Sequence, residues 1–120
     1  MTTIKRIIFT LICIGAIYII YDSIQHIRAE ISHRNGFLKQ VQGYPHIANK
    51  DYQKAVDLMP WETHYRLQLA KSYEATSKKW PSEYIKYINL AIKEYEILIA
   101  FDTINPWFSA RLGLIYYELS

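Results

Sequence analysis

The chain has few of the residues that build covalent or catalytic frameworks. It holds 120 residues, among them one cysteine, four glycines and four prolines. The lone thiol, Cys13, excludes an intrachain disulfide. The sequence shows no Gly-rich phosphate loop, no Cys/His metal spacing and no grouped Ser, His and Asp. We therefore expect no catalysis by this chain alone, no cofactor and no metal site.

Neither positive nor negative charge is in large excess. Fourteen Lys and Arg oppose eleven Asp and Glu, for a net charge of +3, and the longest basic block is Lys78-Lys79. This excess is too weak and too scattered for a nucleic-acid footprint. The length is enough for one small domain.

Apolar residues concentrate near the N-terminus. Residues 7–21 read IIFTLICIGAIYIIY, which would rise about 22 Å as a helix, short of the roughly 30 Å hydrocarbon core. Ile4 extends the run because the two basic residues after it can snorkel toward the headgroups. Tyr18 and Tyr21 suit the opposite interface. We therefore expect residues 1–21 to be a membrane anchor that spans the bilayer with residues 4–21.

A cleaved secretory signal is the alternative, with residues 1–6 as its basic head. The run ends in Tyr-Asp-Ser-Ile, without a small-x-small cleavage pattern, which favours an uncleaved anchor. The basic residues before the run, against Asp22 after it, predict a single pass with the rest of the chain on the extracytoplasmic side. Arg28, Arg34 and Lys39 blunt this asymmetry.

Residues 22–42 are expected to continue as a linker helix, since they contain no proline and a single glycine. Four side chains of metal-binding chemistry follow one stripe of this helix: Asp22, His26, Glu30 and His33. Ligands spread over three turns cannot all reach one ion, so we interpret the stripe as a solvated helix face.

Turn signals divide residues 43–120 into further helices. Gly43-Tyr44-Pro45 ends the linker helix and starts the next one, which Pro60 closes. Trp80-Pro81 and residues 102–106 are later interruptions. Helices are expected over residues 45–59, 61–76, 83–101 and 107–119.

The helical segments repeat. Residues 69–73 read LAKSY, and residues 112–116, forty-three positions later, read LGLIY. Each places a leucine, a small residue and a tyrosine on one helical face. Ala48 and Ala91 each precede the leucine of such a segment by twenty-one residues. A fixed step of this kind indicates a stacked helical array.

These signatures resemble the tetratricopeptide repeat family over about residues 36–119. The resemblance implies an all-α fold in which the transmembrane helix is followed by antiparallel helix pairs of a short α-solenoid in residues 43–120, with an incomplete last repeat. The residues that would form the repeat core are Ala48, Tyr52, Ala55, Pro60, Leu69, Ala70, Tyr73, Ala91, Tyr95, Leu112, Gly113 and Tyr116.

The chain departs from the family pattern in three places. Leu98 stands where alanine is usual, and Thr103 where proline is usual. Tyr73 and Ala91 are eighteen residues apart, twice the ordinary step. We expect the nine or so additional residues to lengthen both helices and the loop that carries residues 78–80.

A narrower resemblance links the apolar helix and the segment KDYQKAVDLMPWETHYRLQLAKSYE to the C-terminal tail of O-antigen ligase and polymerase-type membrane proteins. The polytopic part that transfers glycan in that family is absent from this sequence, so no catalytic residue carries over. The resemblance implies a detached tail or accessory chain of a glycan-assembly enzyme.

A partner-binding groove is expected on the first helix of each pair. The stripe His64, Leu67, Lys71 and Glu74 is distinct from the packing face, and the equivalent stripe on the last helix is Trp107, Ala110, Leu114 and Tyr117. Such a mixed groove suits an extended peptide or a helix, whereas a solvated face with incidental aromatics is the alternative.

The last helix is apolar on every side, with only Arg111 and Glu118 charged. A terminal repeat normally turns a polar face to water. Three interpretations stay open: a truncated fragment, self-association, or packing on another protein or the membrane. The sequence thus predicts a membrane-anchored scaffold for protein–protein interaction, with a glycan-assembly accessory chain as the alternative.

Overall fold

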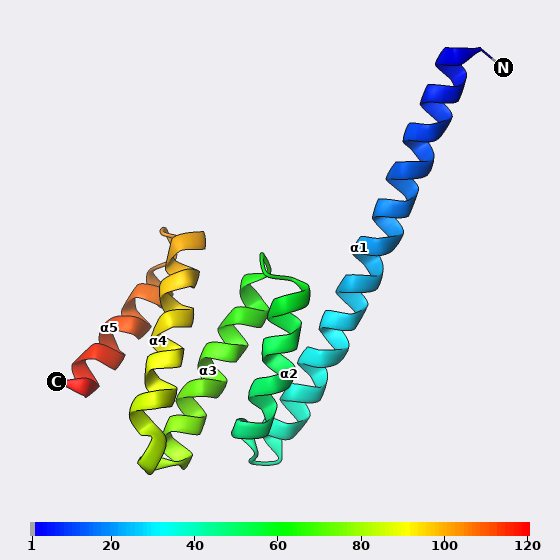
Figure 1. The fold of residues 1–120 in the computed structure, drawn as a ribbon. Coiled ribbons are helices and arrows are strands. Elements are labelled where there is room, and N and C mark those ends of the chain that lie inside the picture. Colours follow the sequence, from blue (N-terminus) through cyan, green and yellow to red (C-terminus); the bar gives the residue numbers. More distant parts are fainter. Residues whose placement is uncertain (1) are drawn as a thin grey trace.

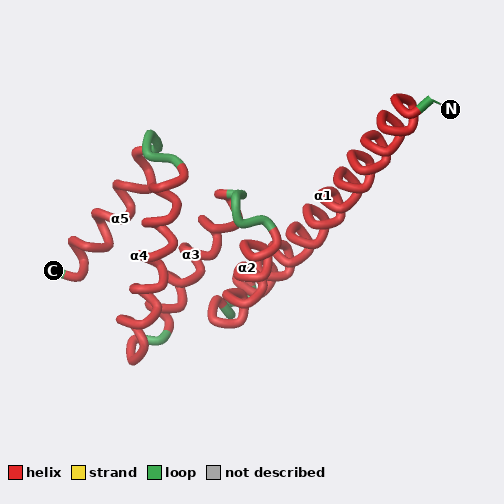
Figure 2. Tube along the Cα trace, turned by 45° about the horizontal axis from the view of Figure 1, so that its top comes forward, coloured by secondary structure: helices red, strands yellow, loops and turns green. Residues whose placement is uncertain are grey.

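The protein is all-helical in the computed structural model, which describes residues 2–120 (Figures 1 and 2). Within that range there is no strand. The elements in chain order are α1 (Thr3–Val41), α2 (Pro45–Leu58), α3 (Thr63–Lys79), the short 3₁₀ turn η1 (Pro81–Glu83), α4 (Tyr84–Phe101) and α5 (Pro106–Leu119). The predicted all-α class is confirmed.

Helix α1 runs unbroken for 39 residues. Its N-terminal half projects away from the other helices (Figure 1) and contains an 18-residue window of mean hydropathy 2.2 that nothing in the chain buries. Within residues 2–120 it is the one helix long and apolar enough to cross a membrane.

The C-terminal half of α1 packs against α2, so residues 22–42 do more than link two parts. Ala29 and Gly36 are buried there. The ammonium of Lys39 lies 2.5 Å from a carboxylate oxygen of Asp51 on α2. The helix that carries the apolar run is therefore also packed into the folded domain.

The predicted break after α1 is confirmed in its local geometry. Gly43 has a φ of +88°, a left-handed conformation that side-chain-bearing residues rarely adopt. The Gly43 amide donates to the Gln40 carbonyl and the Tyr44 amide to the Lys39 carbonyl, which is the Schellman pattern. Pro45 then occupies the first turn of α2, where its missing N–H costs nothing.

The additional residues before α4 enter helices rather than a loop. Helix α3 extends to Lys79, so Lys78 and Lys79 are helical and only Trp80 and η1 separate α3 from α4. The expectation of a lengthened loop over residues 78–80 is corrected, whereas α3 and α4 are longer than α2, as expected. Two lysines suit the last turn of a helix because its C-terminus carries partial negative charge.

Apolar side chains form two cores. The first joins α1, α2 and α3, and the second joins α3, α4 and α5. The first contains Ala29, Ala48, Tyr52, Ala55, Val56, Met59, Tyr65 and Leu69. The second contains Ala70, Ile88, Ala91, Ile92, Tyr95, Leu98, Phe108 and Ile115.

A buried polar seam lies between α2 and α3. The Asn49 amide group donates to Thr76 Oγ1 at 3.1 Å, and its carbonyl oxygen accepts from Ser72 Oγ at 2.6 Å. Ser72 Oγ also lies 3.2 Å from the Pro45 carbonyl oxygen. Because each of the three side chains has a partner, the seam satisfies groups that would otherwise be costly to bury.

Seven of the predicted core residues are fully buried: Ala48, Tyr52, Ala55, Leu69, Ala70, Ala91 and Tyr95. Tyr73 and Leu112 are partly buried against the cores. Pro60, Gly113 and Tyr116 are exposed, which corrects their assignment to the core. Pro60 lies in the turn between α2 and α3, and a Cβ on Gly113 would meet nothing within 4 Å. Tyr116 contacts α4 only at its edge, where its hydroxyl donates to Glu96 at 3.1 Å.

A matched pair of glycine substitutions tests this packing. A Cβ on Gly36 would lie 3.1 Å from the ring of Tyr52, whose hydroxyl is held by Gln40 at 2.6 Å, whereas a Cβ on Gly113 meets nothing within 4 Å. Gly113→Ala should stabilise the fold by about 0.5–1 kcal/mol through helix propensity. Gly36→Ala should destabilise it by about 1–3 kcal/mol through overpacking.

Thermal unfolding of the full chain in detergent micelles, followed by circular dichroism, measures both changes. A rise in the unfolding temperature of Gly36→Ala comparable with that of Gly113→Ala would show that Tyr52 does not confine this position.

Candidate partner-binding groove

Side-chain contacts place α3 between α1 and α5. The Tyr65 hydroxyl on α3 donates to a carboxylate oxygen of Glu30 on α1 at 3.0 Å. Further along α3, the Glu74 carboxylate pairs with the guanidinium of Arg111 on α5. Helix α3 therefore has side-chain contacts with both α1 and α5, in addition to its packing against α2 and α4.

One cavity lies where α3 faces α5, and a second lies beside it on α5. The larger, about 320 Å³, is lined by Lys71, Glu74, Ala75, Lys78, Trp107 and Arg111. The smaller, about 230 Å³, is lined by Trp107, Ala110, Arg111 and Leu114. Five of the eight predicted groove residues thus come together here. We call the two cavities together the α3–α5 groove.

The Glu74 carboxylate is buried beneath this groove. Its side chain is 8% exposed, and its carboxylate accepts from the Tyr95 hydroxyl at 2.5 Å and from Arg111 Nε at 3.3 Å, with a second, shorter contact to Arg111 Nη2. Burial, and then the hydrogen bond to Glu74, raises the pKa of Tyr95. The hydrogen bond to Glu74 likewise raises the pKa of Arg111. This carboxylate is occupied within the fold.

The accessible polar groups of the groove are cationic. Lys71 and Lys78 are exposed, and Lys71 Nζ lies 5.2 Å from the ring centroid of Trp107. A lysine beside an indole forms a favourable cation–π contact. The groove therefore presents positive charge around an aromatic surface.

The remaining three predicted residues lie elsewhere. The ring of His64 contacts the ring of His33 on α1, with centroids 4.9 Å apart and the ring planes tilted by 50°. Leu67 packs against the second core, and Tyr117 is 78% exposed without lining either cavity. Burial, and then the charge of His64, lowers the pKa of His33.

A third cavity, which the sequence did not predict, lies on α1. It measures about 270 Å³ and is lined by Glu30, His33, Arg34 and Phe37. Gly36 is the sequence feature that could have indicated this cavity. It precedes Ala70 by thirty-four residues and contacts Tyr52 in the first core. At the same offset of thirty-four residues, Glu30 corresponds to His64 and Phe37 to Lys71.

The metal-like stripe of α1 is occupied by other contacts. His26 Nε2 lies 3.5 Å from Asp22, Glu30 is bonded to Tyr65, and His33 packs between aromatic rings. In residues 2–120 no group of three or more His, Cys, Asp or Glu is arranged to hold a metal ion.

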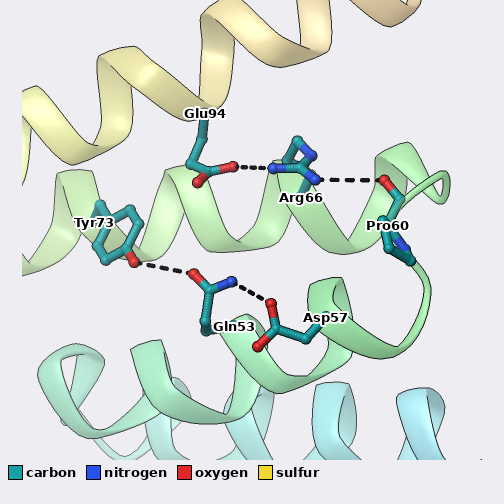
Figure 3. A network of polar contacts seen from close by, with 6 residues as sticks. All are labelled: Gln53, Asp57, Pro60, Arg66, Tyr73 and Glu94. Carbon is teal, nitrogen blue, oxygen red and sulfur yellow. Dashed lines mark hydrogen bonds and ion pairs between the residues drawn. The ribbon is translucent and has the colours of Figure 1, made fainter.

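A polar network holds α3 against α2 and α4 (Figure 3). Arg66 Nη1 donates to Glu94 of α4 at 2.6 Å, and Arg66 Nη2 lies 3.4 Å from the Pro60 carbonyl oxygen. Tyr73 contacts Gln53 of α2 through its hydroxyl at 3.5 Å. The central helix is thus fixed on two sides by directional contacts.

Comparison with known proteins gives no relative. No family model matches the chain, and no curated protein and no solved structure matches it either.

The buried ion pair gives a prediction. Glu74→Ala leaves Arg111 and Tyr95 without their shared acceptor, so the free energy of unfolding should fall by about 2–3 kcal/mol. Glu118→Ala, on the exposed end of α5, should change it by less than about 0.5 kcal/mol. Chemical denaturation of both full-length variants in detergent provides the comparison, and equal effects would contradict the role assigned to Glu74.

Proposed function

We propose that this chain is a membrane-anchored scaffold module of tetratricopeptide-like helix pairs that binds a segment of a partner protein in the α3–α5 groove and performs no chemistry of its own. The α3–α5 groove is the observation that carries the proposal. The array interpretation and the anchor are supported separately.

The array interpretation is supported by equivalent residues in equivalent places. Gly36, Ala70 and Gly113 follow one another at steps of thirty-four and forty-three residues. Ala48 and Ala91, forty-three residues apart, are both fully buried. On this interpretation α1 and α2 form one pair, α3 and α4 a second, and α5 begins a third.

The anchor is supported by where the folded part begins. A cavity of about 370 Å³ lies between Tyr18, Tyr21, Asp22 and Gln25 of α1 and residues 57, 58, 60 and 61, at the end of α2 and in the turn between α2 and α3. Trp61 in that turn is exposed. Residues 4–21 would span about 27 Å, so the bilayer surface would lie near Tyr21, at the level of Trp61.

The chemistry of the groove selects the kind of partner. Lys71 and Lys78 favour carboxylates, while Trp107 and Leu114 offer apolar contact area. An extended or helical segment that combines acidic and apolar side chains meets both requirements.

A site-specific photocrosslinker tests the groove. Incorporated at Ala110 in full-length protein in its own membrane, it should give a covalent adduct with a partner protein, whereas the same group at Lys93, an exposed position of α4 that lines neither cavity, should not. Lys71→Glu should remove the Ala110 adduct by reversing the charge beside Trp107.

Mass spectrometry of the adducts identifies the partner. Adducts that survive Lys71→Glu, or that form equally from Lys93, would overturn the groove assignment. Adducts confined to glycan-assembly enzymes would favour the accessory-chain alternative over a general scaffold.

The proposed topology places the helical domain on the extracytoplasmic side. In a chain with Cys13 replaced by serine, Ser82→Cys in η1 should react with a membrane-impermeant maleimide in intact cells. Thr3→Cys, at the N-terminus of α1, should react with the maleimide only after the membrane is permeabilised. The opposite pattern would reverse the topology, and labelling of both positions from one side would exclude a span.

A further inference from the structure

The face of α1 that points away from the rest of the fold carries a second pattern. Starting at Thr10, ten positions follow one another in alternating steps of three and four residues. We call this set the outer stripe: Thr10, Cys13, Ile17, Ile20, Ile24, Ile27, Ile31, Arg34, Leu38 and Val41. Its seven large aliphatic side chains are between 50% and 68% exposed.

The pattern is clearest beyond residue 21, where the apolar run ends and few large apolar side chains remain. Between residues 22 and 41 there are six large apolar side chains, and five of them belong to the outer stripe; Phe37 is the sixth. Lipid can cover any apolar residue of the span, but it cannot cover Ile27, Ile31 or Leu38 beside the folded domain. With the proposed bilayer surface near Tyr21, these side chains form a contiguous apolar row outside the lipid, which is typical of a protein interaction surface.

The outer stripe lies on the side of α1 opposite the domain. At about 100° per residue, Ile27 and Ile31 are half a turn from Ala29 and Gly36, which are buried against α2 and its neighbours. Packing within the chain therefore leaves the stripe free over its whole length. Alternating steps of three and four are the spacing of the a and d positions of a coiled coil.

We propose that the outer stripe is a homo-oligomer interface, at which α1 of a second copy of this chain packs in parallel to form a coiled coil that runs from the bilayer into the folded domain. The parallel orientation rests on the proposed insertion of α1, because copies anchored in one membrane with one topology have their N-termini on the same side.

Two quantities favour a second copy as the occupant. Joining two copies along the seven aliphatic positions would bury on the order of 1,000 Å² of apolar surface, which reaches the lower bound for a specific interface. Five of these positions would be removed from water, and Ile17 and Ile20, within the proposed span, would pack against the second copy in place of lipid. Anchoring in a shared membrane also raises the effective concentration of one copy around another.

Two of the three members of the outer stripe that are not aliphatic, Arg34 and Cys13, fit this arrangement. Arg34 can pack its aliphatic stem along the interface and extend its guanidinium to solvent. One polar residue among such positions fixes the register of a coiled coil at a cost in stability. Cys13 would lie next to Cys13 of the second copy, in register.

Disulfide crosslinking tests the proposal on the unaltered chain. Full-length protein in phosphatidylcholine vesicles is oxidised with copper phenanthroline and oxygen, which removes two electrons and two protons from each pair of thiols. We expect a Cys13-linked dimer on a non-reducing gel that dithiothreitol reverses.

A cysteine scan gives the matched control. With Cys13 replaced by serine, Ile24→Cys and Ile27→Cys should each give dimers, whereas His26→Cys, exposed at the same depth but off the stripe, should not. Equal dimer yields at His26 and Ile27 would indicate random collision and overturn the interface. Dimers from Gly113→Cys without dimers from Ile27→Cys would assign self-association to α5 instead.

Maleimide labelling distinguishes failure of the proposed interface from failure of the proposed membrane anchor. If Thr3 and Ser82 label from opposite sides and Ile27→Cys gives no dimer, the anchor stands and the interface alone fails. If both positions label from one side, the parallel arrangement fails together with the anchor.

Discussion

The continuity of α1 determines how every other part of this protein is placed. One helix supplies the apolar run at its N-terminal half and a wall of the first core at its C-terminal half, where Ala29 and Gly36 are buried. An unbroken helix transmits both position and rotation along its length. Once the rotation of α1 is set by Tyr52 packing on Gly36, the side chains that face outward along the whole helix are set as well.

Helix α3 has the corresponding role for the α3–α5 groove. It contacts α1 through Tyr65, α4 through Arg66 and α5 through Glu74. Each of these contacts involves a charged group, and the ion pairs made by Arg66 and Glu74 are partly or fully buried. The geometry of the groove therefore depends on charges that are already paired, and the lysines at its rim remain available for a ligand.

The sequence predicted those features that depend on nearby residues. Gly43 and Pro45 specify the break after α1 without help from the rest of the chain, and Ala48 and Ala91 report close helix contacts at a fixed step. Glu74 could not be predicted in the same way, because its burial depends on Arg111, thirty-seven residues later. The exposure of Gly113 and Tyr116 likewise depends on which helices lie beside α5, which a repeat signature alone does not specify.

The polar seam between α2 and α3 has a mechanical consequence. Apolar contacts are not directional, whereas Asn49, Ser72 and Thr76 each lose a specific hydrogen-bond partner when the helices shift. The two cores therefore keep a fixed register. Because α3 contributes to both cores, the seam ties the core that contains α5 to the core that contains α1.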